Sequence, residues 1–322
     1  MRLPDDLNSA LSHELATVPR SALTAASEEL SKRYRSAERD KKPVFMTTLA
    51  HRLAYLAVRM PATYAVVRTV LEEIKHRIPD FAPHSLLDVG AGPGTATWAA
   101  INTFPELTLL ALHEKDSAWL ELGERLMRKS ACAQLNAARW SQRDITQNSV
   151  AERHDLVIMS YVIGELPLEK LGEVISQTWQ SVDHVLVVIE PGTPHGFERI
   201  RLARELLIQA GGWLVAPCPH CKACPMPSDD WCHFSKRLER SSIHMSVKDV
   251  GLGYEDEKYS YVVAAREPIV LPEARILRHP QIHSGHVDMF VCAQNGLEKR
   301  IISRRQGEVY KKARKLDWGD TL

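Results

Sequence analysis

Residues 86–94 constrain the fold of this chain more than any other segment. They begin with a short apolar run over residues 86–89, which is typical of a buried strand. The run leads into a loop that contains Gly90, Gly92 and Gly94, and then into a helical stretch over residues 95–102. Because glycine lets the backbone turn sharply and approach a ligand closely, the segment predicts a strand, a ligand-binding loop and a helix.

The elements expected after this loop alternate along the chain. Strands are expected over residues 107–113, 155–160 and 185–189, and helices over residues 116–130, 168–181 and 198–210. Strands that alternate with helices are typical of an α/β fold with a parallel, doubly wound sheet. Apolar residues recur at helical spacing in residues 1–80, and two further strands are expected over residues 259–265 and 286–293.

The composition of the 322 residues excludes several classes of protein. Apolar residues make up 44% and charged residues 25%, which excludes a globally disordered chain. The net charge of +1 excludes an overall basic surface, so a nucleic acid would have to meet a local patch. No apolar run reaches about 18 residues, so no membrane span is expected. The N-terminal residues lack an apolar signal core and include Asp5 and Asp6, which predicts a cytoplasmic protein.

The spacing of the glycines indicates which class of ligand the loop binds. Dinucleotide-binding loops have the spacing G-x-G-x-x-G, whereas this loop is G-x-G-x-G with Asp88 two residues before its first glycine. That arrangement resembles the first motif of Rossmann-like class I methyltransferases, which bind S-adenosylmethionine. Glu114 ends the second strand, where an acid can accept both ribose hydroxyls of the cofactor. Asp144 ends the third strand segment, where its side chain can reach the adenine. The alternatives are a tight structural turn and two solvated loop acids.

The expected cofactor-binding residues are therefore Asp88, Gly90, Gly92, Gly94, Glu114 and Asp144. The catalytic residues stay unassigned, because the segment at the expected strand 155–160 has neither an Asn-Pro-Pro-aromatic signature nor a Pro-Cys nucleophile. Tyr161 and Glu165 follow the strand that faces the transferred methyl group in this class. Residues at such places are more often structural than catalytic.

Six cysteines are present, and four of them, Cys218, Cys221, Cys224 and Cys232, fall within fifteen residues. In a cytoplasmic protein, this density predicts a metal site rather than disulfides. A Pro-rich loop can bring four thiolates to one centre, and Cys224 is followed by proline as in ferredoxin-type clusters. Zinc is the alternative to iron–sulfur, with His220 or His233 as possible ligands. Free buried cysteines are the third interpretation.

Basic residues are concentrated in two segments although the whole chain is nearly neutral. Residues 32–42 form one segment, and residues 299–315 form the other, within an expected helix over residues 308–316. Such segregation is typical of a surface that meets phosphates, and the alternative is a solvated helix face.

Several stretches together resemble the mitochondrial small-ribosomal-subunit methyltransferase-like family, and we interpret the chain as a bacterial relative. They are residues 59–64, 87–95, 160–166, 218–234, 254–261 and 313–320. The resemblance implies an N-terminal helical region (1–80), a methyltransferase-like core (81–210 and 255–297), a cysteine-rich metal-binding insert (211–254) and a basic tail (298–322).

The resemblance also implies a [4Fe–4S] cluster. Carried over by position, its ligands are Cys218, Cys224, Cys232 and Cys292, which leaves Cys221 as an extra cysteine that could substitute for one of them. The implied partner is small-subunit ribosomal RNA or the assembling small subunit, and the chain is expected to be a monomer.

Two functions follow from this resemblance. One is methyl transfer from S-adenosylmethionine to ribosomal RNA, and the other is a non-catalytic RNA-binding assembly factor. A zinc-dependent hydrolase is a weaker third alternative, because four thiolates leave no open position on the metal.

Overall fold

The computed structural model describes residues 2–35, 48–147, 152–239 and 253–322. The chain forms two compact units. The first consists of residues 1–72, 82–148 and 236–257, and the second consists of residues 73–81, 149–235 and 258–322. The basic segment 32–42 lies outside the residues whose side chains the structure describes.

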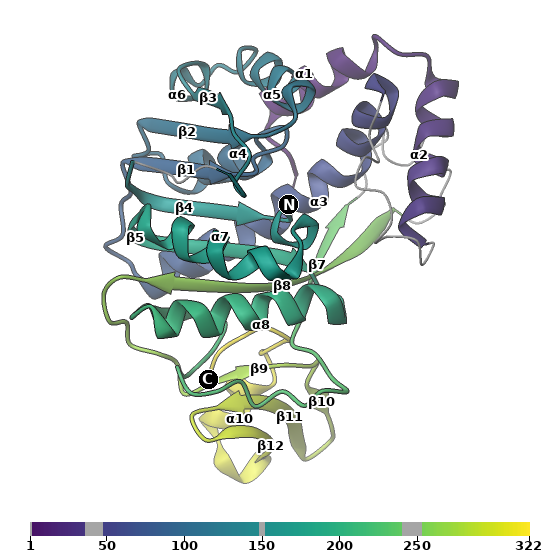
Figure 1. The fold of residues 1–322 in the computed structure, drawn as a ribbon. Coiled ribbons are helices and arrows are strands. Elements are labelled where there is room, and N and C mark those ends of the chain that lie inside the picture. Colours follow the sequence, from purple (N-terminus) through teal and green to yellow (C-terminus); the bar gives the residue numbers. More distant parts are fainter. Residues whose placement is uncertain (1, 36–47, 148–151, 240–252) are drawn as a thin grey trace. The chain divides into compact units, whose positions relative to one another are not determined.

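The first unit contains N-terminal helices followed by the strand–loop–helix segment that the sequence predicts (Figure 1). Its elements are α1 (Asp5–Leu15), α2 (Arg20–Arg35), α3 (Leu49–Arg77, which ends in the second unit), β1 (Ser85–Val89), α4 (Thr95–Thr103), β2 (Leu109–Glu114), α5 (Ser117–Met127), α6 (Ala133–Asn136) and β3 (Arg139–Gln142). The strands run parallel in the order β3-β2-β1.

The register of β1 and β2 positions the glycine loop. Val89 at the end of β1 lies opposite His113, the residue before Glu114. The strand has no exposed side chain from Leu86 to Val89, because the sheet is covered on both faces. The loop therefore leaves the buried sheet beside the carboxyl end of β2.

The second unit contains the other strands of the α/β fold. Its first elements are β4 (His154–Ser160), η2 (Ile163–Glu165), α7 (Leu168–Gln180), β5 (Val182–Pro191), α8 (Pro194–Gln209) and β6 (Trp213–Ala216). β4 and β5 are parallel, and β8 (Tyr254–Ala265) pairs antiparallel with both β5 and β6. β7 (Phe234–Glu239) also pairs with β8, and residues 236–239 of β7 and 254–257 of β8 belong to the first unit.

The strand orders β3-β2-β1 and β4-β5-β8-β6 are the two halves of the class I methyltransferase sheet. The expected Rossmann-like fold class is therefore confirmed, with parallel strands first and an antiparallel strand late in the chain. Residues 217–233, between β6 and β7, form neither helix nor strand, as the sequence predicts for the cysteine-rich stretch.

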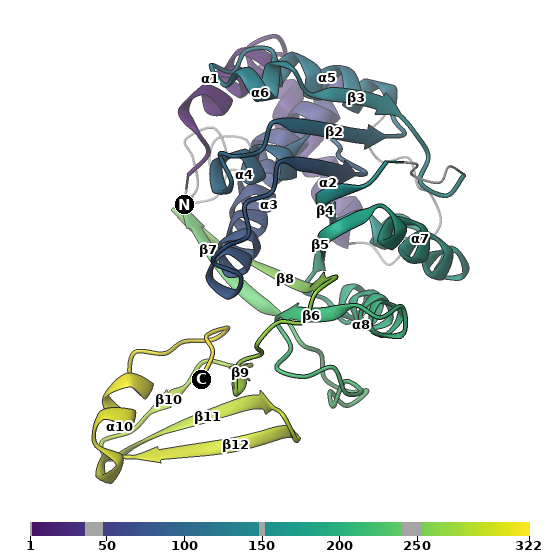
Figure 2. The same cartoon turned by 90° about the vertical axis from the view of Figure 1, so that its left-hand side faces the viewer.

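The last part of the second unit forms a separate antiparallel sheet (Figure 2). It consists of β9 (Ala274–Ile276), β10 (Gln281–Ile282), β11 (His286–Ala293) and β12 (Gly296–Ser303), followed by η3 (Arg304–Gln306) and α10 (Glu308–Ala313). Val287, Met289 and Val291 of β11 form its core with Tyr310 and Ala313 of α10.

This second sheet differs from two sequence-based expectations. Residues 286–293 were grouped with the methyltransferase-like core, but β11 pairs with β9, β10 and β12. Residues 298–303 were assigned to a tail, but they belong to β12. The cause is a tight turn between Ala293 and Gly296, which lets β12 pair immediately with β11. Gly296 has a φ of +119°, which suits glycine.

Within the described residues, no helix has both the length and the apolar character needed to cross a membrane. The helix expected over residues 308–316 is shorter, because α10 ends at Ala313. A hydrogen bond from the Lys315 amide to the Lys312 carbonyl continues the turn.

Candidate functional sites

The glycine loop is fastened to the end of β2 by backbone hydrogen bonds. The amides of Gly90 and Ala91 both donate to the carbonyl oxygen of His113, at 2.9 and 3.0 Å. Gly90, Gly92 and Gly94 have φ values of +67°, +54° and +79°, a region that favours glycine. The sequence prediction of a tight glycine turn is therefore met at all three positions.

The two later glycines meet different surroundings. A Cβ atom at Gly94 would lie 2.5 Å from the Cε atom of Met127, so this flexible side chain of α5 would have to shift. A Cβ atom at Gly92 would meet no atom within 4 Å. Gly92 therefore faces open space, which is what a loop that receives a ligand requires.

The carboxylate of Glu114 holds the loop from the side of β2. Its Oε2 atom accepts a hydrogen bond of 2.8 Å from the Gly92 amide, and its Oε1 atom accepts one of 2.9 Å from the Asp116 amide. Each carboxylate oxygen has a second lone pair, so each could still accept a ribose hydroxyl. The side chain is thus fixed by its backbone contacts in an orientation that a ligand could use.

Asp88 is buried at the end of β1 and ties it to α4. Its Oδ2 atom accepts hydrogen bonds from the amide and the hydroxyl of Thr97, at 3.1 and 2.8 Å. Its Oδ1 atom is buried and accepts no hydrogen bond within the described structure. Burial raises the pKa of Asp88 to about 7, although the Thr97 bonds favour the ionised form. An orphaned acceptor beside the loop fits a ligand that brings a donor.

Asp144 lies two residues after β3, where the sequence places it. Its Oδ1 atom accepts hydrogen bonds of 2.9 and 2.7 Å from the amide and hydroxyl of Thr146, and these bonds lower the pKa of the carboxyl. The side chain closes its own turn and stays ionised. The six residues expected to bind the cofactor all belong to the first unit, but their role as a cofactor site stays a prediction.

Glu190 at the end of β5 is a buried acid that the sequence analysis missed. It is 2% exposed, and burial raises its pKa to about 8. Its Oε1 atom accepts a hydrogen bond of 3.1 Å from the Gly164 amide. Arg199 donates to the carbonyl oxygen of Ile163 at 2.8 Å, so both side chains hold η2. The sequence signal that could have identified Glu190 is its position as an acid at the carboxyl end of a parallel strand.

Tyr161, which precedes η2, has an unusual backbone conformation. Its φ of +60° is the only positive φ among the described non-glycine residues. Strained conformations of this kind are concentrated at functional sites. Glu165 is exposed on η2. Neither residue is assigned as a catalytic base.

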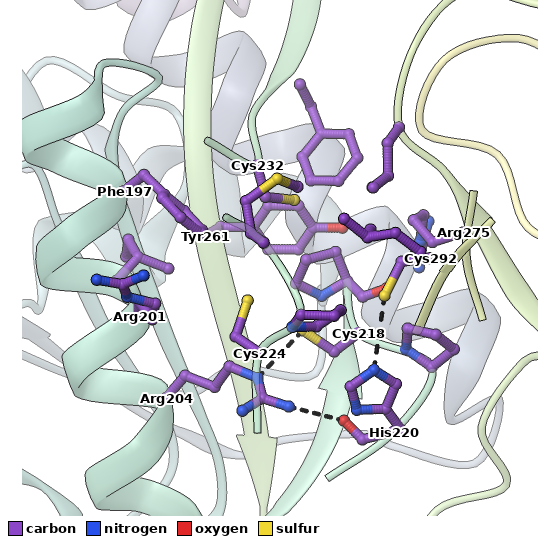
Figure 3. Close-up of a pocket in the computed structure, with 18 residues that line it drawn as sticks. Phe197, Arg201, Arg204, Cys218, His220, Cys224, Cys232, Tyr261, Arg275 and Cys292 are labelled. Atoms are coloured by element: carbon purple, nitrogen blue, oxygen red, sulfur yellow. Dashed lines mark hydrogen bonds between the residues drawn. The ribbon is translucent and has the colours of Figure 1, made fainter. Parts of the chain in front are cut away.

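The second candidate site is a pocket that four cysteines share (Figure 3). Cys218, Cys224, Cys232 and Cys292 line it, and all six cysteines of the chain are free thiols. Cys218, Cys224 and Cys232 come from the stretch between β6 and β7, whereas Cys292 comes from β11. Cys221 is not among the lining residues. The fold therefore brings together the four cysteines that the family resemblance implies.

The spacing of the thiols separates two kinds of metal site. No three of these sulfur atoms lie within 4.8 Å of one another among the described side chains. A tetrahedral zinc ion with Zn–S bonds of about 2.3 Å needs its sulfurs about 3.8 Å apart. In a four-iron cluster each thiolate binds a different iron, so the sulfurs lie further apart. The thiols are therefore not arranged around a single zinc ion in the described structure.

The two histidines considered as zinc ligands lie differently. His220 lines the pocket, and its Nε2 atom lies 3.6 Å from the Sγ atom of Cys292. His233 does not line it, since its ring stacks on Trp231 and its Nδ1 atom lies 3.1 Å from the Trp231 carbonyl oxygen. The structure therefore does not support His233 as a metal ligand in this pocket.

Two nitrogen atoms of the pocket residues have no hydrogen-bond partner in the described structure. Arg204 of α8 is 3% exposed and donates from Nε to Cys218 and from Nη2 to two carbonyl oxygens, yet its Nη1 atom is buried without a hydrogen bond in the described structure. The Nδ1 atom of His220 is likewise unsatisfied. The Nη1 donor of Arg204 suits the sulfur atoms of an anionic centre.

The protonation of the thiols follows from burial. Burial raises the pKa of Cys292 to about 12 and that of Cys232 well above its usual value, with the neighbouring thiolates adding to both shifts. A thiol must lose its proton to bind a metal, so loading the pocket releases protons. The guanidinium of Arg204 places a positive charge beside the Cys218 sulfur.

The comparisons with known proteins agree over most of the chain. The sequence model of the family described as mitochondrial small ribosomal subunit Rsm22 matches residues 50–322. The human mitochondrial ribosome assembly protein METTL17 is 29% identical over 291 residues, which cover 84% of this chain and 62% of that protein. The mitochondrial Rsm22-cox11 tandem protein 2 of Schizosaccharomyces pombe is 25% identical over 322 residues, which cover 83% of this chain and 42% of that protein.

The chain thus spans less than two thirds of the length of these relatives. Among solved structures, the magnesium protoporphyrin IX methyltransferase of Synechocystis with bound S-adenosylmethionine covers 74% of this chain and 91% of its own, at 13% identity and a TM-score of 0.43. That score is too low to carry an argument, so the fold class rests on the strand order.

The comparisons contradict the prediction of a cytoplasmic protein. The family and the relatives are described as mitochondrial. A targeting signal is a local feature, so Asp5 and Asp6 showed only that one segment lacks the composition of such a signal. They could not decide the compartment.

Proposed function

The chain belongs to the mitochondrial small ribosomal subunit Rsm22 family, and from that premise we propose that it is an S-adenosylmethionine-binding, methyltransferase-like protein that acts in assembly of the small ribosomal subunit. The observation that carries the cofactor proposal is the hydrogen bond between the Gly92 amide and Glu114. This hydrogen bond holds the carboxylate of Glu114 beside the glycine loop, and the space beside Gly92 is open.

In this proposal each loop residue has a defined part. Glu114 accepts the ribose hydroxyls through its second lone pairs, and Asp144 meets the adenine. Asp88 fastens β1 to α4 and offers its Oδ1 atom to a donor of the ligand. Gly90, Gly92 and Gly94 keep the space open and allow the turn.

We propose that the cysteine pocket holds a [4Fe–4S] cluster through Cys218, Cys224, Cys232 and Cys292. Such a cluster supplies an anionic centre that cross-links its protein ligands. Arg204 would balance its charge, and His220 would donate a hydrogen bond beside Cys292. The cysteine stretch would thereby be fastened to β11, the central strand of a different sheet from the one the sequence analysis expected.

The proposed partner is small-subunit ribosomal RNA. Lys311, Lys312, Arg314 and Lys315 are exposed on and after α10, while Tyr310 and Ala313 pack into the core of the second sheet. A helix held by its apolar face leaves its cations free to meet phosphates. Methyl transfer to this RNA is the second candidate function, favoured by the strained backbone of Tyr161 at the end of β4.

One experiment tests both functions. Calorimetry measures binding of S-adenosylmethionine, and transfer of labelled methyl groups into small-subunit RNA is followed under the same conditions. Binding of both cofactor and RNA without methyl incorporation supports the assembly factor, and incorporation supports the enzyme. A folded protein that binds neither S-adenosylmethionine nor small-subunit RNA contradicts both.

A further inference from the structure

Three potential metal ligands gather on the hairpin formed by β10 and β11, away from the cysteine pocket. They are His283, His286 and Asp288, and each offers a ligand atom within 4.8 Å of those of the other two. His286 and Asp288 lie two residues apart on β11, so their side chains share one face of the strand. His283 follows β10 and lies across the hairpin turn from His286.

The backbone of this turn is held in place. The His283 amide donates to the His286 carbonyl oxygen at 2.9 Å, and the Arg304 amide donates to the Gly285 carbonyl oxygen at 2.8 Å. The two imidazole rings stack with centroids 4.4 Å apart and planes inclined by 17°. The two ring planes are therefore nearly parallel before any ion is bound.

Asp288 is oriented toward the histidines by a neighbouring cation. Lys299 of β12 lies 2.7 Å from its Oδ2 atom, while its Oδ1 atom lies 3.3 Å from the Nε2 atom of His286. The side chain is 12% exposed, and Oδ1 accepts no hydrogen bond by geometric criteria within the described structure. The Lys299 ammonium also lowers the pKa of the Asp288 carboxyl, which keeps it an anionic ligand.

We propose that His283, His286 and Asp288 form a second metal site, which binds a divalent transition-metal ion such as Zn²⁺. Two imidazoles select borderline metals such as zinc over Mg²⁺ or Ca²⁺, which prefer oxygen ligands only. Two histidines and one carboxylate are also the ligand set of zinc sites that keep an open position. Lys299 supports the carboxylate from outside, as hydrogen-bonding partners of metal ligands do.

The site closes with small side-chain movements. A tetrahedral ion with bonds of about 2.1 Å needs its ligand atoms about 3.4 Å apart. His283 is exposed and the side chain of His286 is 41% exposed, so both rings can turn without disturbing the core. The remaining metal position faces solvent and takes water, and the bound ion joins both sides of the hairpin turn.

Zinc titration by calorimetry tests the site in the full-length protein. Wild type should bind one more equivalent of Zn²⁺ than His286→Ala, and Asp288→Asn should weaken this equivalent by roughly tenfold or more. The matched control is His184→Ala, which removes a histidine whose side chain is 58% exposed and which lies outside the cluster. Zinc bound by cysteine thiols is the same background in every variant, so the differences report on the hairpin alone.

Cobalt gives a second readout. Co²⁺ added to Cys218→Ser protein should still occupy the hairpin and give ligand-field bands of a nitrogen and oxygen site. His286→Ala in that background should remove these bands and leave unchanged any thiolate charge-transfer band from the remaining cysteines. Without metal, Asp288→Asn should have the same melting temperature as the wild type, because asparagine preserves the shape of the side chain. Equal zinc stoichiometry and affinity in wild type, His286→Ala and Asp288→Asn would overturn the proposal.

Discussion

The Nε atom of Arg204 donates a hydrogen bond of 3.3 Å to the Sγ atom of Cys218. This contact joins α8 to the cysteine stretch and places a buried positive charge beside a group that must become negative to bind a metal. The same guanidinium donates to the carbonyl oxygens of His220 and Lys222, at 2.9 and 2.6 Å. One side chain therefore both shapes the loop and favours its thiolates.

The first prediction concerns the metal. Protein purified without oxygen should contain about four irons per chain. Serine at Cys218, Cys224, Cys232 or Cys292 should each remove most of the iron, because all four side chains line the pocket. Iron analysis and visible absorption measure the outcome.

Two cysteines serve as controls for this prediction. Cys221→Ser and Cys132→Ser should keep the iron, since neither residue lines the pocket. Loss of iron in Cys221→Ser together with retention in Cys292→Ser would move the ligand assignment to the four clustered cysteines. Stoichiometric zinc without iron would contradict the cluster.

The second prediction concerns the cofactor. Gly92→Arg should abolish S-adenosylmethionine binding, because its side chain would fill the open space beside the loop. Gly211→Arg is a matched control, since Gly211 also has a positive φ, +81°, and open surroundings. Both variants carry a similar backbone cost of about 1–2 kcal/mol. Calorimetry should show binding only in the control, and equal affinities would remove the loop from the site.

The third prediction concerns pH. The pKa of Glu190 is raised to about 8, against about 4.3 in an unfolded chain. The folded protein thus keeps a proton that the unfolded chain releases, so the free energy of unfolding should fall as pH rises between these values, by at most about 5 kcal/mol. Glu190→Gln cannot ionise, so it should reduce this fall and be the more stable protein near pH 8.

Urea unfolding across this pH range measures the effect. Glu169→Gln changes an exposed glutamate of α7 and should follow the wild-type curve. A Glu190→Gln curve that parallels the wild type would show that this carboxyl is ionised in the folded protein.

The fourth prediction concerns RNA. Glutamate at Lys311, Lys312, Arg314 and Lys315 should weaken binding to small-subunit RNA, and each lost phosphate contact should reduce the salt slope by about 1. S-adenosylmethionine binding should be unchanged, because these residues lie outside the glycine loop. Lys311 already pairs with Glu308, both exposed, so its contribution should be the smallest.

A second fourfold variant controls for total charge. It replaces exposed cations elsewhere with glutamate, namely Arg20, Lys75, Arg128 and Lys170. Fluorescence titrations over a salt series should separate the two variants. If both lower RNA affinity equally, the effect is one of net charge and the tail is not a specific RNA surface.

The amino-acid sequence by itself determined the elements whose signal is local. The apolar run before Gly90, the glycine spacing and the helix after it predicted β1, the loop and α4, because a strand of period two and a helix of period 3.6 are encoded in neighbouring residues. The same reasoning located β4, α7 and β5. It also singled out the cysteine stretch as a segment without regular structure.

Only the tertiary structure decided which of these elements meet. β11 has the pattern of any half-buried strand, and its pairing with β12 placed it in a second sheet. That pairing brings Cys292 into the pocket lined by Cys218, and packing of α8 adds Arg204. The burial that raises the pKa of Glu190 likewise depends on neighbours distant in sequence. Periodicity records which face of an element is apolar, but the partner of that face is chosen by packing of the whole chain.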